Sequence, residues 1–142
     1  VVDDHPMVME YLCSAVAKAL PDAVVRSASD LGTALELARE GTLDMALLDL
    51  GLPGCGGIES LLRFRKAFPD VRVVVVSADD DLASVRGALA AGAAGFLPKS
   101  AGPKVFVDAL RLLAEGGRYF PPRVQERAVE NQEEQQGGTK AG

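Results

Sequence analysis

Five side chains in this sequence have the chemical types that a phosphoryl-transfer site needs: Asp3, Asp4, Asp49, Ser77 and Lys99. Three carboxylates gathered in one pocket repel each other and raise each other's pKa values unless a cation lies between them. The available ligands are all oxygens, which favours Mg²⁺. Such an ion and a lysine ammonium would neutralise the oxygens of a phosphoryl group while a carboxylate attacks the phosphorus in line.

These residues can meet only if the chain folds so that distant segments end at the same place. The sequence alternates short apolar runs with longer amphipathic stretches, a pattern typical of βα units around a parallel sheet. The expected strands are 1–2 (the end of a truncated strand), 23–26, 45–48, 71–76 and 95–97. The five side chains follow the first, third, fourth and fifth of these runs. Because parallel strands share their carboxyl edge, where open α/β sheets bind ligands, we expect all five on one rim.

Amphipathic stretches fill the intervals between the apolar runs. We expect helices at about 6–20, 31–40, 58–68, 82–91 and 104–115. Gly41, Gly92 and Gly116 stand just after three of them, where a left-handed C-cap is common. The pattern therefore predicts five helices alternating with five strands.

Length and composition fit one globular domain. The chain has 142 residues, of which 48% are hydrophobic and 25% charged. A net charge of −5 argues against a broad electropositive face for nucleic acid. The longest apolar run, 88–97, is well short of the roughly 18 residues of a spanning helix. No signal peptide is visible, so we expect a cytoplasmic protein.

Several other chemistries are excluded by residue type. His5 is the only histidine, so no zinc site with two histidines can form, and we expect His5 to act locally at the start of a helix. Neither GxGxxG nor GxxxxGK[ST] occurs, so those nucleotide-binding loops are absent. Cys13 and Cys55 form no CxxC motif, and we expect both to be reduced.

Four motifs carry a resemblance to a known family. They are VVDDHP at the start, LLDLGLPGCGGIE around Asp49, VVVVSADDD around Ser77 and AGAAGFLPKS leading to Lys99, with EGGRYFPP after the last expected helix. In combination they resemble the receiver domain of bacterial two-component response regulators, most closely the NarL/LuxR type, over residues 1–122. The resemblance implies a flavodoxin-like, doubly wound (βα)5 fold with a five-stranded parallel sheet in the order 2-1-3-4-5.

The same resemblance assigns the metal site and the phosphoacceptor. Asp49 matches the residue that takes the phosphoryl group. Asp3, Asp4, Asp49 and the backbone carbonyl of Gly51 match the groups that hold Mg²⁺. Because Gly51 has no side chain to steer an attacking water, the lifetime of the phosphoryl group is left open.

The resemblance also implies a conformational switch. Lys99 would bind the phosphoryl group, and Ser77 would hydrogen-bond with one of its oxygens on activation. Phe96, three residues before Lys99, would be the aromatic switch that swings inward as Ser77 moves. The expected protein is a phosphoacceptor and not an enzyme with a separate substrate, catalysing at most its own phosphoryl transfer and slow dephosphorylation.

Partners follow from the resemblance as well. We expect a sensor histidine kinase as phosphoryl donor and a homodimer on activation, with no membrane contact. Residues 123–142 are expected to form a polar linker or tail, in part helical, leading to a helix-turn-helix output domain outside this sequence. DNA would be bound only through that domain, which makes the intact protein a phosphorylation-controlled transcription regulator.

Three alternatives stay open from the sequence. One is a stand-alone receiver that acts by protein contacts. Another is a pseudo-receiver that works without phosphorylation, although such chains have usually lost an acid or the lysine. The third is a haloacid-dehalogenase-like phosphatase, which needs a general acid where this chain has Gly51.

Overall fold

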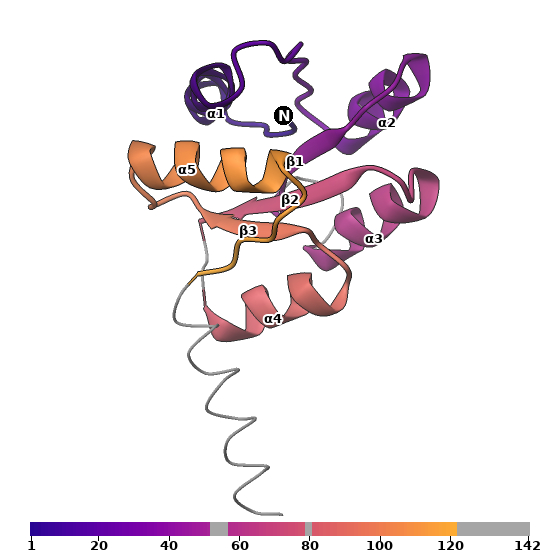
Figure 1. Ribbon diagram of the computed structural model, residues 1–142. Coiled ribbons are helices and arrows are strands. Elements are labelled where there is room, and N and C mark those ends of the chain that lie inside the picture. Colours follow the sequence, from indigo (N-terminus) through magenta and orange to yellow (C-terminus); the bar gives the residue numbers. More distant parts are fainter. Residues whose placement is uncertain (52–56, 79–80, 122–142) are drawn as a thin grey trace, which may run out of the picture.

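A three-stranded parallel sheet forms the centre of the structure, in the order β1-β2-β3. The computed structural model describes residues 1–51, 57–78 and 81–121. The strands are β1 (Met45–Asp49), β2 (Arg72–Ser77) and β3 (Gly95–Pro98). Five helices surround them: α1 (Pro6–Ala19), α2 (Leu31–Glu40), α3 (Ile58–Ala67), α4 (Leu82–Ala90) and α5 (Pro103–Ala114) (Figure 1). The predicted α/β architecture with a parallel sheet and five helices is confirmed.

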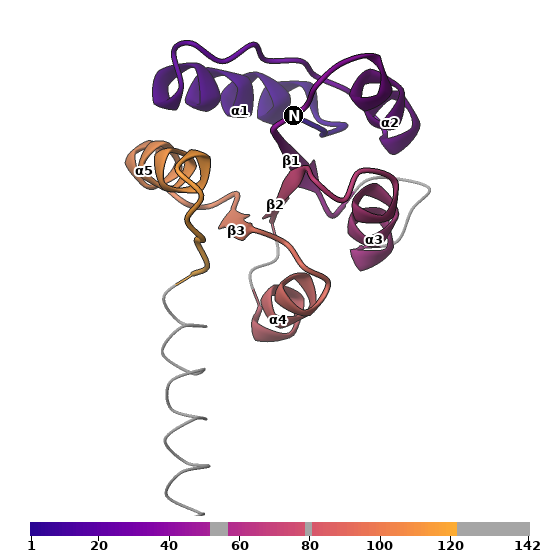
Figure 2. The same ribbon diagram turned by 45° about the vertical axis from the view of Figure 1, so that its right-hand side comes forward.

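The helices cover the sheet on both faces (Figure 2). Successive side chains of a strand point to opposite faces, so β2 contributes to two cores. Val74 and Val76 pack with α1 and α5, whereas Val73 and Val75 pack with α2, α3 and α4. All four valines are fully buried. The continuous apolar run is therefore explained by burial on both faces, as in other parallel sheets.

The predicted five-stranded sheet is not seen in full, because only three strands form within the described residues. Val2 makes single parallel bridges to Leu48 and to Ala28. The segment 23–26, predicted as a strand, has no strand assignment. Backbone hydrogen bonds join Ala28 to Val1 and to Asp3, but they form a single bridge and not a regular ladder.

Local chemistry explains where the helices begin. Asp30 accepts a hydrogen bond from the backbone N–H of Thr33 at 2.7 Å and so caps α2. Asp81 caps α4 in the same way, through Ser84 at 2.7 Å. Helices α1 and α5 instead start with proline, whose missing N–H is not needed in the first turn.

Glycine ends two helices as predicted and a third differently. Gly92 and Gly116 have φ of +91° and +94°, the left-handed conformation expected just after α4 and α5. Gly41 is extended, with φ of −162°, so the prediction of a left-handed cap there was wrong.

The segment after α5 lies along the sheet. Tyr119 forms a parallel bridge with Gly95, and its carbonyl accepts a hydrogen bond from the Phe96 N–H at 2.8 Å. The Arg72 guanidinium donates to the carbonyls of Gly116 and Gly117. The end of α5 is thus fixed to both β2 and β3.

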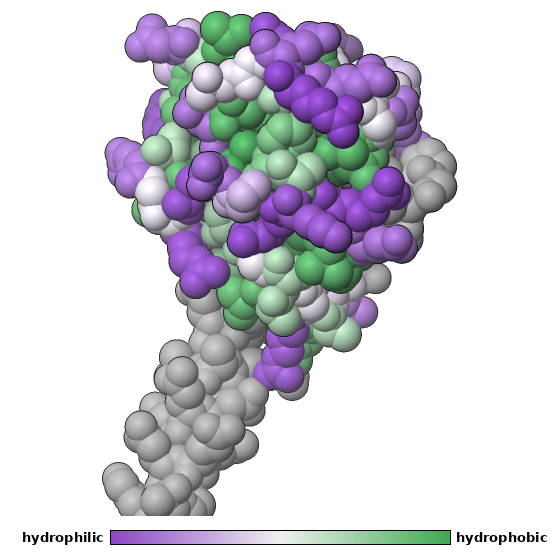
Figure 3. Space-filling view, turned by 90° about the vertical axis from the view of Figure 1, so that its right-hand side faces the viewer, coloured by the Kyte–Doolittle hydropathy of each residue, from purple (hydrophilic) through white to green (hydrophobic). Residues whose placement is uncertain are grey.

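The outer surface mixes polar and apolar side chains. Figure 3 shows hydrophilic and hydrophobic residues interspersed over the face that α2 and α3 turn to the viewer. No helix within the described residues is long and apolar enough to cross a membrane. The predicted linker, 123–142, lies outside these residues.

Candidate functional site

Chain segments that are distant in sequence meet at the carboxyl edge of the sheet. Asp49 is the last residue of β1 and Ser77 the last of β2, while Lys99 follows β3 directly. Asp3 comes directly after the Val2 bridges to Ala28 and Leu48. The Lys99 N–H donates to the Ser77 carbonyl at 2.8 Å, which holds the loop after β3 against β2. The structure thus places these residues together at the carboxyl edge of the sheet, as the sequence predicted.

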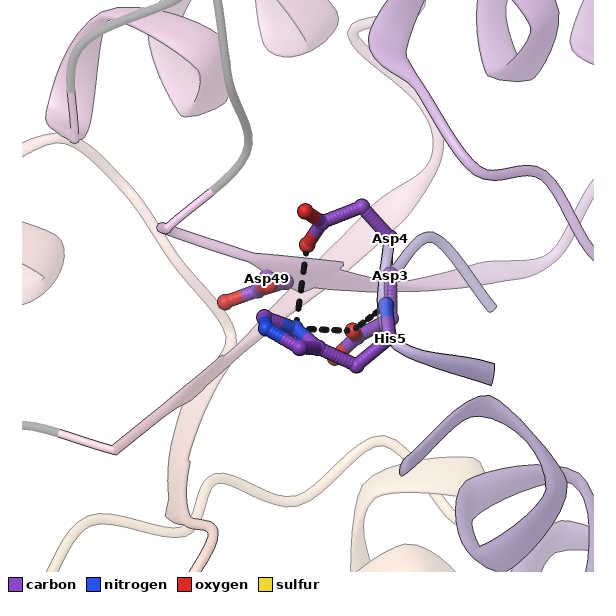
Figure 4. A group of neighbouring side chains, drawn as sticks. All are labelled: Asp3, Asp4, His5 and Asp49. Carbon is purple, nitrogen blue, oxygen red and sulfur yellow. Dashed lines mark hydrogen bonds and ion pairs between the residues drawn. The ribbon is translucent and has the colours of Figure 1, made fainter. Parts of the chain in front are cut away.

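Three carboxylates and one imidazole form an acidic cluster at this edge. One ligand atom from each of Asp3, Asp4, His5 and Asp49 lies within 4.8 Å of the others. Figure 4 shows the His5 ring beside Asp3 and Asp4, with Asp49 next to it. Asp3 and Asp49 are almost fully buried, with 1% and 2% of their surfaces exposed. Burial of carboxylates is costly unless positive charge compensates them.

Lys99 supplies part of that compensation. Its Nζ lies 3.1 Å from Oδ2 of Asp3 and 3.3 Å from Oδ1 of Asp49. One ammonium against the three carboxylates leaves an excess of two negative charges before any charge on His5 is counted. A divalent cation would balance that excess.

The two oxygens of Asp49 have different surroundings. Oδ1 accepts a hydrogen bond from the Gly51 N–H at 2.9 Å and also faces Lys99. Oδ2 is buried and has no hydrogen-bond partner in the part of the chain that the structure describes. A buried carboxylate oxygen without a partner is unfavourable, which fits a group that gains a metal ion or a covalent bond. The residues present therefore fit a divalent ion held by carboxylates.

Gly51 lies directly beside the Asp49 carboxylate. A Cβ atom at this position would stand 3.4 Å from Oδ1 of Asp49, an ordinary van der Waals contact. The backbone N–H of Gly51, and not a side chain at this position, donates the hydrogen bond that orients the Asp49 carboxylate. The role of the Gly51 carbonyl as a metal ligand stays a prediction.

The two predicted switch residues are both buried. Ser77 has 7% of its surface exposed and Phe96 has none. Phe96 belongs to the core beneath α2, α3 and α4, and its Cα pairs in register with Val75. The ring therefore occupies an inward position on β3. Its movement, and that of Ser77, stay predictions.

An apolar cavity of about 260 Å³ adjoins the acidic cluster. Lys99 borders it, and the other lining residues come from α1 and α5: Met7, Val8, Tyr11, Leu12 and Phe106. Met7 is 84% exposed although it is a large apolar residue. The sequence analysis did not anticipate this cavity, since it arises where two helices meet.

A comparison with protein families agrees with this site. The family model described as the response regulator receiver domain matches residues 1–111. The chain belongs to this family. Receiver domains generally bind Mg²⁺ at an acidic pocket, and this chain has a cluster of aspartates. The resemblance of the motifs to this family is confirmed.

Curated relatives of this receiver domain are named as activators and response regulators, and two of them, ExaE of Pseudomonas putida and DegU of Brevibacillus brevis, as transcriptional regulators. The Glycerol metabolism activator of Pseudomonas putida is 35% identical over 125 residues, covering 87% of this chain and 57% of the relative. The response regulator GacA of Pseudomonas aeruginosa is 36% identical over 124 residues, covering 87% of this chain and 58% of the relative. The chain thus spans little more than half the length of these proteins.

Solved structures show the same receiver fold. A LuxR-family two-component response regulator from Aurantimonas sp. SI85-9A1 is 34% identical, with a TM-score of 0.81 and coverage of 92% of this chain and 94% of that one. The receiver domain of the putative response regulator NarL from Mycobacterium tuberculosis is 37% identical, with a TM-score of 0.71 and coverage of 81% and 93%. These neighbours place the receiver domain in the NarL/LuxR group.

His5 stands at the start of α1 and makes local contacts, as predicted. Its side chain makes no capping hydrogen bond to that helix within the described residues. Its Nδ1 instead lies 3.1 Å from Oδ1 of Asp4 and 3.3 Å from Oδ1 of Asp3. The available signal was its position directly after the acidic pair, which puts a third potential ligand on the same loop.

Proposed function

We propose that this chain is the phosphoacceptor switch domain of a two-component response regulator. Asp49 would take a phosphoryl group from a sensor histidine kinase in a Mg²⁺-dependent reaction. The observation that carries the proposal is the buried Oδ2 of Asp49, which has no hydrogen-bond partner among the described residues. The Lys99 ammonium lies 3.3 Å from the other oxygen of the same carboxylate.

The transfer is a simple displacement. A lone pair on Asp49 Oδ2 forms the new O–P bond while the P–N bond of a phosphohistidine breaks, and the released imidazole takes up a proton. Mg²⁺, when bound, supplies positive charge to the phosphoryl oxygens. Asp3 and Asp4 would hold the ion, and Lys99 would attract a further phosphoryl oxygen. Asp49 is consumed as the acceptor, so the domain is not an enzyme acting on a separate substrate.

Activation would follow from new contacts at the same edge. Ser77 ends β2 and Phe96 lies on β3, so a phosphoryl group on Asp49 can act on both strands. The Ser77 hydroxyl would bond to a phosphoryl oxygen, and Phe96 would hold its inward position in that state. Such a two-state change is biased by charge-assisted hydrogen bonds.

The output lies outside this chain. Because relatives of about twice the matched length are transcription regulators, we propose that the intact protein is one too. Residues 123–142 would be the polar linker to a DNA-binding domain, and phosphorylation would favour a homodimer. We also propose a cytoplasmic location and, with a longer first strand, the sheet order 2-1-3-4-5. A stand-alone receiver acting by protein contacts is the alternative.

Intact-mass spectrometry tests the central step. The chain is incubated with acetyl phosphate or phosphoramidate and Mg²⁺. We expect one phosphoryl adduct on the parent chain, none on Asp49→Asn, and none after removal of Mg²⁺. Asp44→Asn is the matched control, since Asp44 is exposed just before the other end of β1. No adduct on a folded parent chain would instead support a pseudo-receiver.

A further inference from the structure

We propose that the imidazole of His5 is itself a ligand in the divalent-metal site. The site would then have a mixed nitrogen and oxygen donor set and would favour borderline ions such as Co²⁺ over Mg²⁺ more strongly than carboxylates alone do. This inference rests on the metal site of the proposed function and goes beyond it by naming a fourth protein side chain and a metal preference.

The spacing of the ligand atoms is the first observation. The His5 Nδ1 lies 3.1 Å from Asp4 Oδ1 and 3.3 Å from Asp3 Oδ1. Two ligands at right angles on an octahedral ion, with bonds of 2.0–2.1 Å, stand about 3 Å apart. The three atoms are therefore arranged at nearly the separation that adjacent ligands of one ion require.

The second observation is the buried oxygen on the far side of the same cluster. Oδ2 of Asp49 has no hydrogen-bond partner within the described residues, and the side chain is 3% exposed. The ligand atoms of His5 and Asp49 belong to one group within 4.8 Å. An ion at the centre of this group would contact both residues.

The third observation concerns what His5 does not do. It occupies the N-cap position of α1, yet its side chain makes no capping hydrogen bond in the described structure. The Nδ1 is directed to the two carboxylates, as Figure 4 shows. The side chain is also 63% exposed, so an ion can reach the ring from solvent. Without a metal ion, the ring is held in this orientation by its contacts with the Asp3 and Asp4 carboxylates.

The metal preference follows from the ligand type. Imidazole suits borderline transition-metal ions, whereas Mg²⁺ prefers oxygen ligands and keeps several waters. Carboxylates alone already bind Co²⁺ more tightly than Mg²⁺ by the usual order of affinities. His5 should enlarge that difference in affinity, because an imidazole nitrogen strengthens the binding of Co²⁺ and does little for Mg²⁺.

Calorimetric titration of the full chain with Co²⁺ and with Mg²⁺ tests the proposal. The titration is done at pH 8, where an ordinary imidazole is neutral. We expect His5→Ala to weaken Co²⁺ binding by about tenfold or more and Mg²⁺ binding by less than about threefold. The Mg²⁺ titration of the same variant is the control for folding and general electrostatics. Asp49→Asn should weaken both ions, which places the Co²⁺ in this cluster.

Two results would overturn the role of His5. One is an equal loss of both affinities in His5→Ala, which would indicate a general charge or folding effect. The other is that His5→Ala binds both Co²⁺ and Mg²⁺ as tightly as the parent chain does. His5→Asn serves as a second variant, because its amide can cap α1 and offers an oxygen: it should keep Mg²⁺ binding and lose the added preference for Co²⁺.

The adduct experiment keeps the two proposals apart. A parent chain that gains no phosphoryl group, but whose Co²⁺ preference depends on His5, would refute the phosphoacceptor proposal and retain this one. A parent chain that gains the adduct, with a metal preference independent of His5, would do the reverse.

Discussion

The Lys99 ammonium lies 3.3 Å from Oδ1 of Asp49, although the two residues stand at the ends of strands that are not neighbours in the sheet. Asp49 ends β1, Lys99 follows β3, and β2 lies between these strands. The side chain of Lys99 therefore crosses the end of β2 to reach the acidic cluster. Its own backbone is held there by the Ser77 carbonyl, which accepts the Lys99 N–H at 2.8 Å.

Removal of this ammonium should destabilise the metal-free protein. In Lys99→Met the carboxylates of Asp3 and Asp49 lose their positive partner, and the free energy of unfolding at neutral pH should fall by about 1–3 kcal/mol. This is less than for a fully buried pair, since the Lys99 side chain is 18% exposed. Urea unfolding in EDTA measures the change. Lys104→Met, an exposed site on α5, should have no comparable effect.

Neutralising Asp49 should have the opposite effect. Asp49→Asn removes one of the three clustered negative charges. The new amide can also donate a hydrogen bond to a neighbouring carboxylate. We therefore expect the free energy of unfolding in EDTA to rise by about 1–2 kcal/mol. Millimolar Mg²⁺ should then raise the unfolding temperature of the parent chain but not of the variant. Thermal unfolding with and without Mg²⁺ checks both. An equal Mg²⁺ response in the two proteins would show that the ion binds elsewhere.

Gly95 should tolerate no side chain. A Cβ atom there would stand 2.9 Å from the Tyr119 carbonyl and 3.0 Å from Cδ2 of Leu113. Gly95→Ala should therefore lower the free energy of unfolding by about 1–3 kcal/mol. Gly41→Ala is the control, because Gly41 is extended and has nothing within 4 Å of the added atom. If both variants unfold at the same urea concentration, the close contact at β3 is wrong.

The cap of α2 should stabilise the protein only where Asp30 is ionised. The Thr33 N–H, which donates to this carboxylate, lowers the pKa of Asp30. A group with a lowered pKa in the folded state contributes stability above its unfolded pKa of about 3.9, and that contribution is lost as pH falls through the folded value.

Comparison of Asp30→Ala with the parent chain tests this cap. The variant should unfold at a lower temperature at pH 7, and the difference should shrink steadily as the pH is taken below about 3.9. Asp22→Ala, at an exposed site before α2, should show no such pH-dependent difference. If the difference in unfolding temperature between Asp30→Ala and the parent chain does not depend on pH, the ionised cap is not its cause.

The sequence predicted which edge of the sheet carries the site, because parallel strands all end at the same edge. Each of Asp49, Ser77 and Lys99 ends or follows an apolar run, and parallel strands bring those ends together whatever the details of packing. Helix positions were predictable for a similar reason, since amphipathic spacing is a local property of the sequence. The capping hydrogen bonds of Asp30 and Asp81 were not predicted and were found only in the structure.

Features that depend on a neighbour were not predictable. Residues 23–26 have β-forming side chains, but a strand also needs a partner of sufficient length, and Val1–Asp3 supply only single bridges. The conformation of Gly41 depends on where the chain must go next. The orientation of the His5 ring depends on how the carboxylates of Asp3 and Asp4 are placed, which no spacing reveals.

The pairing of Tyr119 with β3 couples the segment after α5 to the strand next to the acidic cluster. The same strand carries Phe96 and leads to Lys99, and its Gly95 and Phe96 are joined to Tyr119 by a bridge and a 2.8 Å hydrogen bond. The segment that leads up to Pro121 is therefore held by the strand that leads to Lys99. A displacement of β3 along its own axis would break or shift these two contacts with Tyr119, so the end of the described chain is mechanically coupled to the position of Lys99.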